Sequence, residues 1–337
     1  MGSKKKKSLE KNETPSKAES TAKNEAPSKT ESTVKIEKYI GRVGQGNVYF
    51  MKFLRIFIAE RQWVMVITAA LIAWIVAFVV GRAMFVTMEG TQLGALALAC
   101  ICLWNGVFNS IQVVCKERAI IKREHRSGLS ITSYVASHMM IQAILCVIQT
   151  IVTIAVLAIC GVHFPAQGIV TPFFLFDLFV TLFLATYASD MLGLMVSCIV
   201  HNTTIAMTVM PFILIVQLVF AGVAFPLSGF AEKLSYFTVT RHGVTAICME
   251  ANYNSLSSMV VVSPLRKVGK MIPALKEIVD EIGEDTIAEF TGEFVQDEKY
   301  EASPGRVLVE WALLLAFSAG FALLGWVVLK FIDHDKR

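Results

Sequence analysis

The chain alternates between long apolar stretches and short polar segments, and the lengths of the apolar stretches predict its main elements. A helix needs about 20 apolar residues to cross roughly 30 Å of hydrocarbon. Six stretches reach this length: residues 62–81, 92–115, 132–162, 170–200, 204–225 and 307–332. His163, Pro165 and Gly168 interrupt the pattern between the third and fourth stretches, so we expect two helices joined by a short turn there. The pattern predicts an all-α membrane protein with six transmembrane helices, five of them within residues 62–225.

The segment before the first span, residues 50–61, has a helical pattern with charge on one side. Apolar side chains recur at i, i+3, i+4, i+7 and i+8, at Phe50, Phe53, Leu54, Phe57 and Ile58. The other side carries Lys52, Arg55, Glu60 and Arg61. This pattern predicts a connecting helix in the inner membrane interface, with its aromatic rings in the acyl boundary.

Residues 226–305, between the last two spans, change character twice. Residues 226–250 are too polar to span and too apolar for an ordinary loop. Re-entrant helices fit them best, since irregular backbone at membrane depth is tolerated only against protein or a wet cavity. From Pro264 to Pro304 the chain is polar and acidic, with an apolar helical face at Leu275, Ile278, Val279 and Ile282. We expect a small external acidic cap there.

Composition and charge support a membrane protein and orient it. The chain is 55% hydrophobic and only 17% charged, which is too apolar for an ordinary soluble domain of 337 residues. Lys and Arg concentrate in the N-terminal tail, after the second span and at the C-terminus. The positive-inside rule then places both termini in the cytoplasm of a multi-pass cell-membrane protein. Residues 306–337 supply the last span and the cytoplasmic C-terminus.

The N-terminal tail, residues 1–49, carries a 12-residue repeat. KNETPSKAESTA at 11–22 returns as KNEAPSKTESTV at 23–34. This composition cannot bury a core, so we expect disorder. The tail contains no apolar signal-peptide core. It is either a solvated tail or a segment whose Lys4–Lys7 cluster binds anionic lipid headgroups.

The chain offers little catalytic or metal chemistry. The seven Cys show neither metal spacing nor a disulfide framework, and we expect Cys248 to be a partly buried free thiol, although a disulfide to a second subunit is an alternative. Asp177 and Asp190 are 13 residues apart in one span, on nearly opposite helical faces, and cannot act as a dyad. We expect Asp177 near the external headgroups and Asp190 hydrogen-bonded to a neighbouring helix. No metal, catalytic group or nucleic-acid partner is predicted.

Residues 116–131, KERAIIKREHRSGLSI, concentrate charge between two apolar spans. The positive-inside rule alone accounts for the basic residues. It does not require Glu117 and Glu124 on one helical face at i, i+7, or the apolar Ile120 and Ile121 between them. Spacing alone leaves two interpretations open, a simple cytoplasmic loop and a helix that docks a soluble partner.

The order of several short motifs resembles the ABCG-type exporters. In that family a coupling helix that contacts the ATPase has an ER, E, G and Y pattern, matched here by Glu117, Arg118, Glu124, Gly128 and Tyr134. FAG at 220–222, LSYF at 234–237 and RHGVTAI at 241–247 are similar to the family's FSG, LxYFS and RYGxTAL, with His242 replacing the usual aromatic. MLGLMVSCIVHNTTIAM at 191–207 looks like its tight turn between spans 4 and 5. The resemblance covers about residues 50–333.

The resemblance implies roles for particular residues. Contacts to the ATPase would come from Glu117, Arg118, Arg123, Glu124 and Gly128 in a cytoplasmic coupling helix. A central substrate cavity would be lined by Asn105, Phe108, Asn109, Phe212, Gln217 and Phe220, for which ordinary helix packing is the alternative. Val223 and Ala224 would form the outer gate, and Arg241 and His242 would lie on the re-entrant helix.

The expected function is that of a permease subunit of an ATP-driven exporter. The sequence has no GxxxxGK[ST] motif, so we expect ATP and Mg on a separate ABC ATPase subunit and no cofactor or enzymatic activity on this chain. A second permease subunit, identical or homologous, and membrane lipids would be its other partners. The substrate would be hydrophobic or amphipathic: a drug, a lipid or an antimicrobial peptide. The alternatives are a peptide-sensing or immunity permease of the same fold, a secondary transporter using Asp190, and a structural membrane protein.

Overall fold

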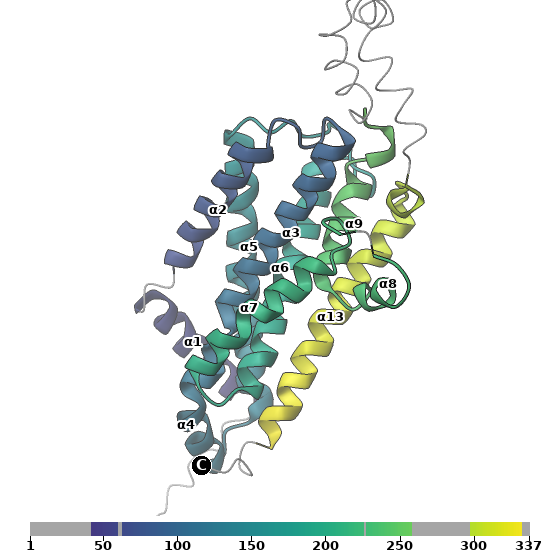
Figure 1. Ribbon diagram of the computed structural model, residues 1–337. Coiled ribbons are helices and arrows are strands. Elements are labelled where there is room, and N and C mark those ends of the chain that lie inside the picture. Colours follow the sequence, from purple (N-terminus) through teal and green to yellow (C-terminus); the bar gives the residue numbers. More distant parts are fainter. Residues whose placement is uncertain (1–41, 60–62, 226, 258–296, 332–337) are drawn as a thin grey trace, which may run out of the picture. The chain divides into compact units, whose positions relative to one another are not determined.

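The computed structural model describes residues 42–59, 63–225, 227–257 and 297–331, all within one compact unit, Ile40–Arg337 (Figure 1). Within these ranges the regular structure is helical, with one isolated bridge between Thr87 and Ser257. In chain order the elements are α1 (Arg42–Ala59), α2 (Val64–Val80), α3 (Met88–Ser110), α4 (Val113–Arg126), α5 (Ile131–Ile159), α6 (Phe174–Ile199), α7 (Thr203–Val219), α8 (Phe230–Ser235), α9 (Val239–Glu250), the 3-10 turns η1 (Tyr253–Ser255) and η2 (Glu298–Tyr300), and α13 (Pro304–Lys330).

Each predicted span coincides with a helix, but the count of six is not confirmed. Among the described residues, four helices are long and apolar enough to cross a membrane: α3 continued by α4, then α5, α6 and α13. Helices α2 and α7 have 17 residues each, which gives them about 25 Å at 1.5 Å per residue. A fifth candidate is the pair α1 and α2, which meet at 64°. The predicted break at His163, Pro165 and Gly168 is confirmed, since α5 ends at Ile159 and α6 begins at Phe174.

Helix α6 lies at the centre of the bundle, with α3 and α13 packed along it (Figure 1). Small residues allow α3 and α6 to approach closely. A Cβ atom on Gly106 of α3 would lie 2.3 Å from the carbonyl oxygen of Thr186, and one on Gly193 of α6 would lie 2.6 Å from Ser110 Oγ. Ser110 Oγ also donates a hydrogen bond to the carbonyl oxygen of Asp190 at 2.5 Å. These contacts hold α3 and α6 close together at the centre of the bundle.

Helix α1 differs from its prediction in both start and environment. It begins at Arg42, inside the stretch assigned to the tail. The sequence did not predict this start, because the glycines at 44 and 46 lower the helix propensity of the segment. Contacts with α5 compensate: Ser137 Oγ donates to the carbonyl oxygen of Gly46 at 2.8 Å. The ring of Phe53 is 5% exposed and packs against Tyr134 and His138, with ring centroids 5.6 and 3.7 Å away. The expectation that this aromatic sits in the acyl boundary is therefore wrong.

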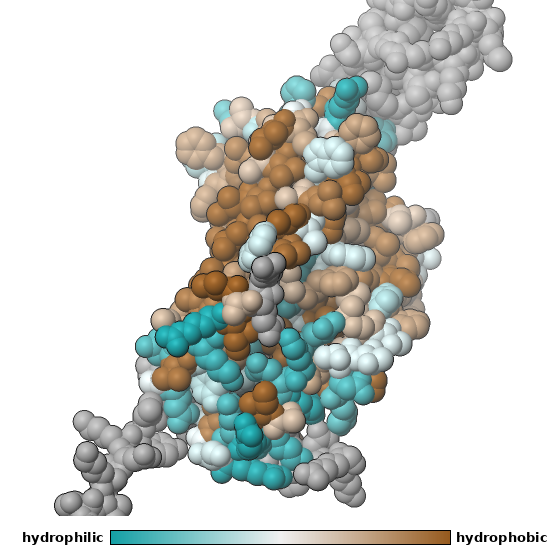
Figure 2. Space-filling model, turned by 90° about the vertical axis from the view of Figure 1, so that its left-hand side faces the viewer, coloured by the Kyte–Doolittle hydropathy of each residue, from teal (hydrophilic) through white to brown (hydrophobic). Residues whose placement is uncertain are grey.

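The segment predicted to contain re-entrant helices forms α8 and α9. Every residue of α9 is buried, and the helix contacts α3, α6 and α13. The N-terminal repeat and most of the acidic cap lie outside the described residues. Figure 2 shows hydrophobic residues over the middle of the visible face and hydrophilic residues gathered at its lower end, the end at which α4 lies in Figure 1.

Candidate functional site: the α4 surface, the inner cavity and the α9 network

Helix α4, which contains most of the predicted coupling segment, is hydrogen-bonded to the end of α6. The backbone N–H groups of Val114 and Cys115 donate to Ser197 Oγ at 3.0 and 3.1 Å. Arg118 Nη1 donates to the carbonyl oxygens of Cys198 and Val200 at 2.7 and 3.3 Å. A cation at these last carbonyls is favourable because a helix leaves them without intrahelical partners and negatively polarised. Arg118 therefore contacts its own chain at this point.

Glu117 and Glu124 share one face of α4, as their spacing predicts, and that partly exposed face contacts α1 and α5. Tyr49 of α1 donates its hydroxyl hydrogen to Glu124 Oε2 at 2.9 Å, and Lys52 Nζ lies 3.7 Å from Glu124 Oε1. Tyr134 of α5 donates to Glu117 Oε2 at 3.5 Å. Both carboxylates therefore have partners within the chain. The i, i+7 spacing predicted the shared face, but it does not say which neighbour that face meets.

The exposed side of α4 carries Lys116, Ala119, Ile120 and Arg123. Of the predicted ATPase contacts, Arg123 lies on this face. Gly128 ends the segment with φ of +101°, a backbone conformation that favours glycine. The surface combines positive charge with an isoleucine side chain that is 41% exposed.

A cavity of about 440 Å³ lies beside α4 and is lined mainly by apolar side chains and amides. Phe108 and Asn109, both predicted cavity residues, are part of its wall. Trp104 stacks on Phe108 with ring centroids 4.8 Å apart. Asn109 Nδ2 donates to Gln149 Oε1 at 2.8 Å, and Gln149 Nε2 donates to Asn109 Oδ1 at 3.1 Å. This reciprocal amide pair joins α3 to α5 and satisfies the polar atoms that burial would otherwise penalise.

The other predicted cavity and gate residues do not converge on this space. Asn105 is buried within α3. Gln217 Oε1 accepts from the Thr240 N–H at 3.3 Å, so it connects α7 to α9. Phe220 caps α7, and Phe212 is 66% exposed on its outer face. Of the gate pair, Val223 is half-buried against the core and Ala224 is exposed.

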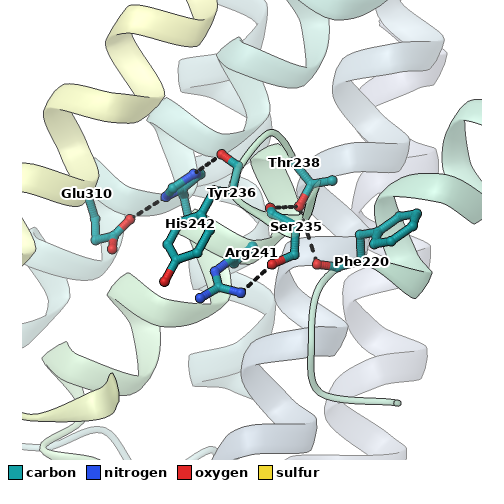
Figure 3. A network of polar contacts seen from close by, with 7 residues as sticks. All are labelled: Phe220, Ser235, Tyr236, Thr238, Arg241, His242 and Glu310. Atoms are coloured by element: carbon teal, nitrogen blue, oxygen red, sulfur yellow. Dashed lines mark hydrogen bonds and ion pairs between the residues drawn. The ribbon is translucent and has the colours of Figure 1, made fainter. Parts of the chain in front are cut away.

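A polar network surrounds the start of α9 and includes both residues predicted there (Figure 3). His242 Nε2 donates to the carbonyl oxygen of Tyr236 at 2.9 Å, and Nδ1 lies 2.6 Å from Glu310 Oε2 on α13. Because the carbonyl can only accept, the proton between Nδ1 and Glu310 belongs either to a histidine cation or to a neutral carboxyl. The His242 ring lies 5.5 Å from the Phe317 ring. Position 242 thus packs against α13, which explains why an aromatic-sized ring is accommodated there.

A family model described as ABC-2 type transporter matches residues 50–249, which is more than half of the chain. The chain belongs to the ABC-2 type transporter family. An ABC transporter ATP-binding/permease protein of Mycobacterium tuberculosis is 32% identical to it over 149 residues. That match covers 43% of this chain and 17% of the relative's length. This ABC-2 chain is therefore a membrane component of a transport system, and the matched residues include α4, the walls of the cavity beside α4 and all of α9 except its last residue.

Asp177 and Asp190, the two aspartates of the fourth predicted span, have structural partners in this ABC-2 chain. Asp190 is fully buried, and Cys146 Sγ of α5 donates to its Oδ2 at 3.4 Å, which confirms the expected hydrogen bond to a neighbouring helix. Asp177 is also buried, and it accepts from the Val170 N–H at 2.9 Å and from Thr171 Oγ1 at 2.7 Å. It organises the turn before α6. Cys248 is a free thiol and fully buried, whereas partial burial was expected.

Sequence reasoning missed several residues on which the site depends. Glu310 is an acid within the last apolar stretch, and an ionisable residue in a span is a signal that could have singled it out. Gln142 and Gln149 recur at i, i+7 in an otherwise apolar span, which could have indicated a polar face toward a neighbour. Tyr49 gave no such signal, because it lay in a stretch assigned to the tail.

Proposed function

We propose that this ABC-2 chain is the permease subunit of an exporter, and that an ATPase on a separate subunit docks on the exposed face of α4. The observation that carries the proposal is the two-sided character of α4. One side presents Arg123 and Ile120 outward, and the other side bonds through Glu117 and Glu124 to α5 and α1. Through Arg118, α4 also contacts the end of α6. A displacement of α4 is thereby transmitted to three helices at once.

ATP and Mg would be held by the ATPase, whose closure supplies the differential binding energy that shifts the permease between two states. The apolar cavity of about 440 Å³ supports a hydrophobic or amphipathic substrate, since its wall mixes aromatic, methionine and amide side chains. A second permease copy or a homologous partner would complete the pathway, with Val223 and Ala224 at the outer gate.

The test is affinity purification in mild detergent of wild type, Arg123→Glu and Arg82→Glu, with transport and ATPase activity measured on each. Arg82 is exposed in the turn after α2, so its variant makes the same charge change away from α4. We expect an ATPase to co-purify with wild type and with Arg82→Glu, and at least tenfold less of it with Arg123→Glu. If both variants retain the ATPase and transport, α4 is not the docking element.

The alternative hypothesis, a secondary transporter with its ion site at Asp190, predicts the opposite result. Its transport would persist without any ATPase and would be abolished by Asp190→Asn. The full burial of Asp190 and its bond to Cys146 favour the ATP-driven proposal. The peptide-sensing alternative relied on the acidic cap, which lies outside the described residues.

A further inference from the structure

A second cavity, of about 260 Å³, lies where α9, η2 and the start of α13 meet. Its wall is formed by Tyr236, Arg241, Thr245, Met249, Lys299, Gly305, Arg306, Val309 and Glu310. Three of these side chains are cations and one is a carboxylate. This imbalance in a partly enclosed space is the starting point for a binding site that is independent of the proposed function.

Arg241 is the most buried of the three cations, with 7% of its surface exposed. Its Nη1 donates to the neutral hydroxyl of Ser235, and its guanidinium lies over the Tyr236 ring, 3.9 Å from the centroid (Figure 3). Neither neighbour carries a compensating charge. Within the described part of the chain, no carboxylate lies within ion-pair distance of this guanidinium. A buried cation of this kind is costly unless an anion accompanies it.

Lys299 brings a second positive charge to the same cavity. Its Nζ donates to the Tyr300 hydroxyl at 3.3 Å and lies 4.9 Å from the centre of that ring. Burial, reinforced by the charge of Arg241, lowers the pKa of the Lys299 amine. Two cations held close enough to oppose each other's charge would both be stabilised by an anion between them.

Thr245 supplies an independent sign of a missing ligand. Its side chain is 4% exposed, lines the cavity, and its Oγ1 is buried with no hydrogen-bond partner among the described residues. A buried hydroxyl without a partner destabilises the folded protein. The first turn of α13 also faces the cavity at Gly305, and the Ser303 side chain does not cap that turn. The positive end of the α13 dipole therefore adds to the positive potential that Arg241 and Lys299 create in the cavity.

The acidic groups nearby limit the charge that the cavity can accept. Glu310 is turned to His242, and the outermost cation, Arg306, is paired with Glu301 at 2.9 Å. An adjoining cavity of about 550 Å³ shares Arg241 and Lys299 and is also lined by Glu232, Asp297 and Glu298. These acids would repel a polyphosphate. Asp297 and Glu310 already offset part of the charge of Lys299, so a ligand with a single negative charge suits the cavity better than one with several.

We propose that this cavity binds the phosphate group of an anionic phospholipid headgroup between Arg241, Lys299 and Thr245. The lipid source follows from the surface around the opening. Val309, on the wall, is 57% exposed and continues into the exposed apolar face of α13 at Leu308 and Leu313. Acyl chains can lie along this face while the headgroup phosphate occupies the cavity. A soluble anion would gain nothing from that apolar surface.

The test measures lipid binding to the purified full chain by native mass spectrometry and thermal stability, with phosphatidylglycerol and phosphatidylcholine as probes. Variants are Lys299→Gln, Thr245→Val and, as a control, Lys233→Gln. Lys233 is an exposed lysine at the end of α8, so its variant removes the same charge outside the cavity wall. Thr245→Val replaces the unpartnered hydroxyl by a methyl group of the same shape and keeps the fold.

We expect wild type and Lys233→Gln to bind phosphatidylglycerol at least tenfold more tightly than phosphatidylcholine. Lys299→Gln should lose about tenfold in affinity for phosphatidylglycerol and Thr245→Val severalfold, with both proteins remaining folded. Equal binding of the two lipids by wild type, or equal loss in Lys299→Gln and Lys233→Gln, would overturn the proposal. Displacement of phosphatidylglycerol by millimolar inorganic phosphate would overturn the lipid assignment and leave a small-anion site.

Discussion

At the scale of single residues, glycines determine how closely the central helices approach. Gly106 has the backbone of Thr186 so near that a methyl group has no room, whereas Gly320 of α13 has no atom within 4 Å of the place a Cβ would occupy. The two positions are both glycines inside long helices, and only the tertiary contacts separate them. This contrast provides a matched pair of substitutions.

We predict that Gly106→Ala destabilises the protein and that Gly320→Ala does not. The added methyl of Gly106→Ala must displace backbone atoms of α6, an overpacking cost of about 1–3 kcal/mol. Gly320→Ala raises helix propensity without a clash. Thermal unfolding of the detergent-solubilised variants measures the difference. Equal melting temperatures for the two variants would show that α3 and α6 do not pack as described.

At the scale of elements, α4 is bonded to the rest of the chain along one side. Its contact with α1 consists of a partly exposed ion pair, Lys52 with Glu124, and the Tyr49 hydrogen bond to the same carboxylate. Partly exposed pairs of this kind contribute less than about 1 kcal/mol to stability. We expect these contacts to matter more for the angle between α1 and α4 than for stability.

We predict that Glu124→Lys reduces transport per ATP hydrolysed by about fivefold or more while the protein level stays unchanged. The new lysine faces Lys52, so α1 and α4 separate locally. Adding Lys52→Glu restores an ion pair of reversed polarity and should recover part of the coupling. The measurement is the ratio of transport to ATPase activity in proteoliposomes. If the double variant is no better than the single one, the pair does not transmit motion.

At the scale of the whole molecule, the outer face of α7 mixes apolar with small and polar residues. This helix has 17 residues and contacts α3, α4 and α9 along one side. The other side exposes apolar residues together with Thr204, Thr208 and Pro211. Small and polar residues are typical of helix–helix interfaces in membranes, whereas lipid favours a purely apolar face. We therefore expect this face to meet a second copy of the chain rather than lipid.

We predict that Phe212→Cys, in a Cys160→Ser background, forms a disulfide between two copies in native membranes. Cys160 is exposed and is removed to avoid competing reactions. Leu323→Cys is the control, because Leu323 is 60% exposed on the apolar face of α13. Non-reducing electrophoresis after mild oxidation distinguishes the two. Crosslinking of Leu323→Cys alone would move the interface to α13.

Much of the architecture is readable from the sequence because it depends on local pattern. The lengths of the apolar stretches predicted the helices, and the break before residue 174 followed from proline and glycine. Family motifs also predicted a helix at the positions of α4 and of α9. The number of spans did not follow, since α2 and α7 are shorter than their apolar stretches suggested.

The sequence by itself determined that the chain is a helical membrane protein, where its helices lie, and that Glu117 and Glu124 share a face. Only the tertiary structure decided that this face meets α1 and α5, that Asn109 pairs with Gln149, and that the start of α1 extends to Arg42. The physical reason is that periodicity records the composition of a helix face and not its neighbour. Which neighbour satisfies a buried polar group depends on residues distant in the chain.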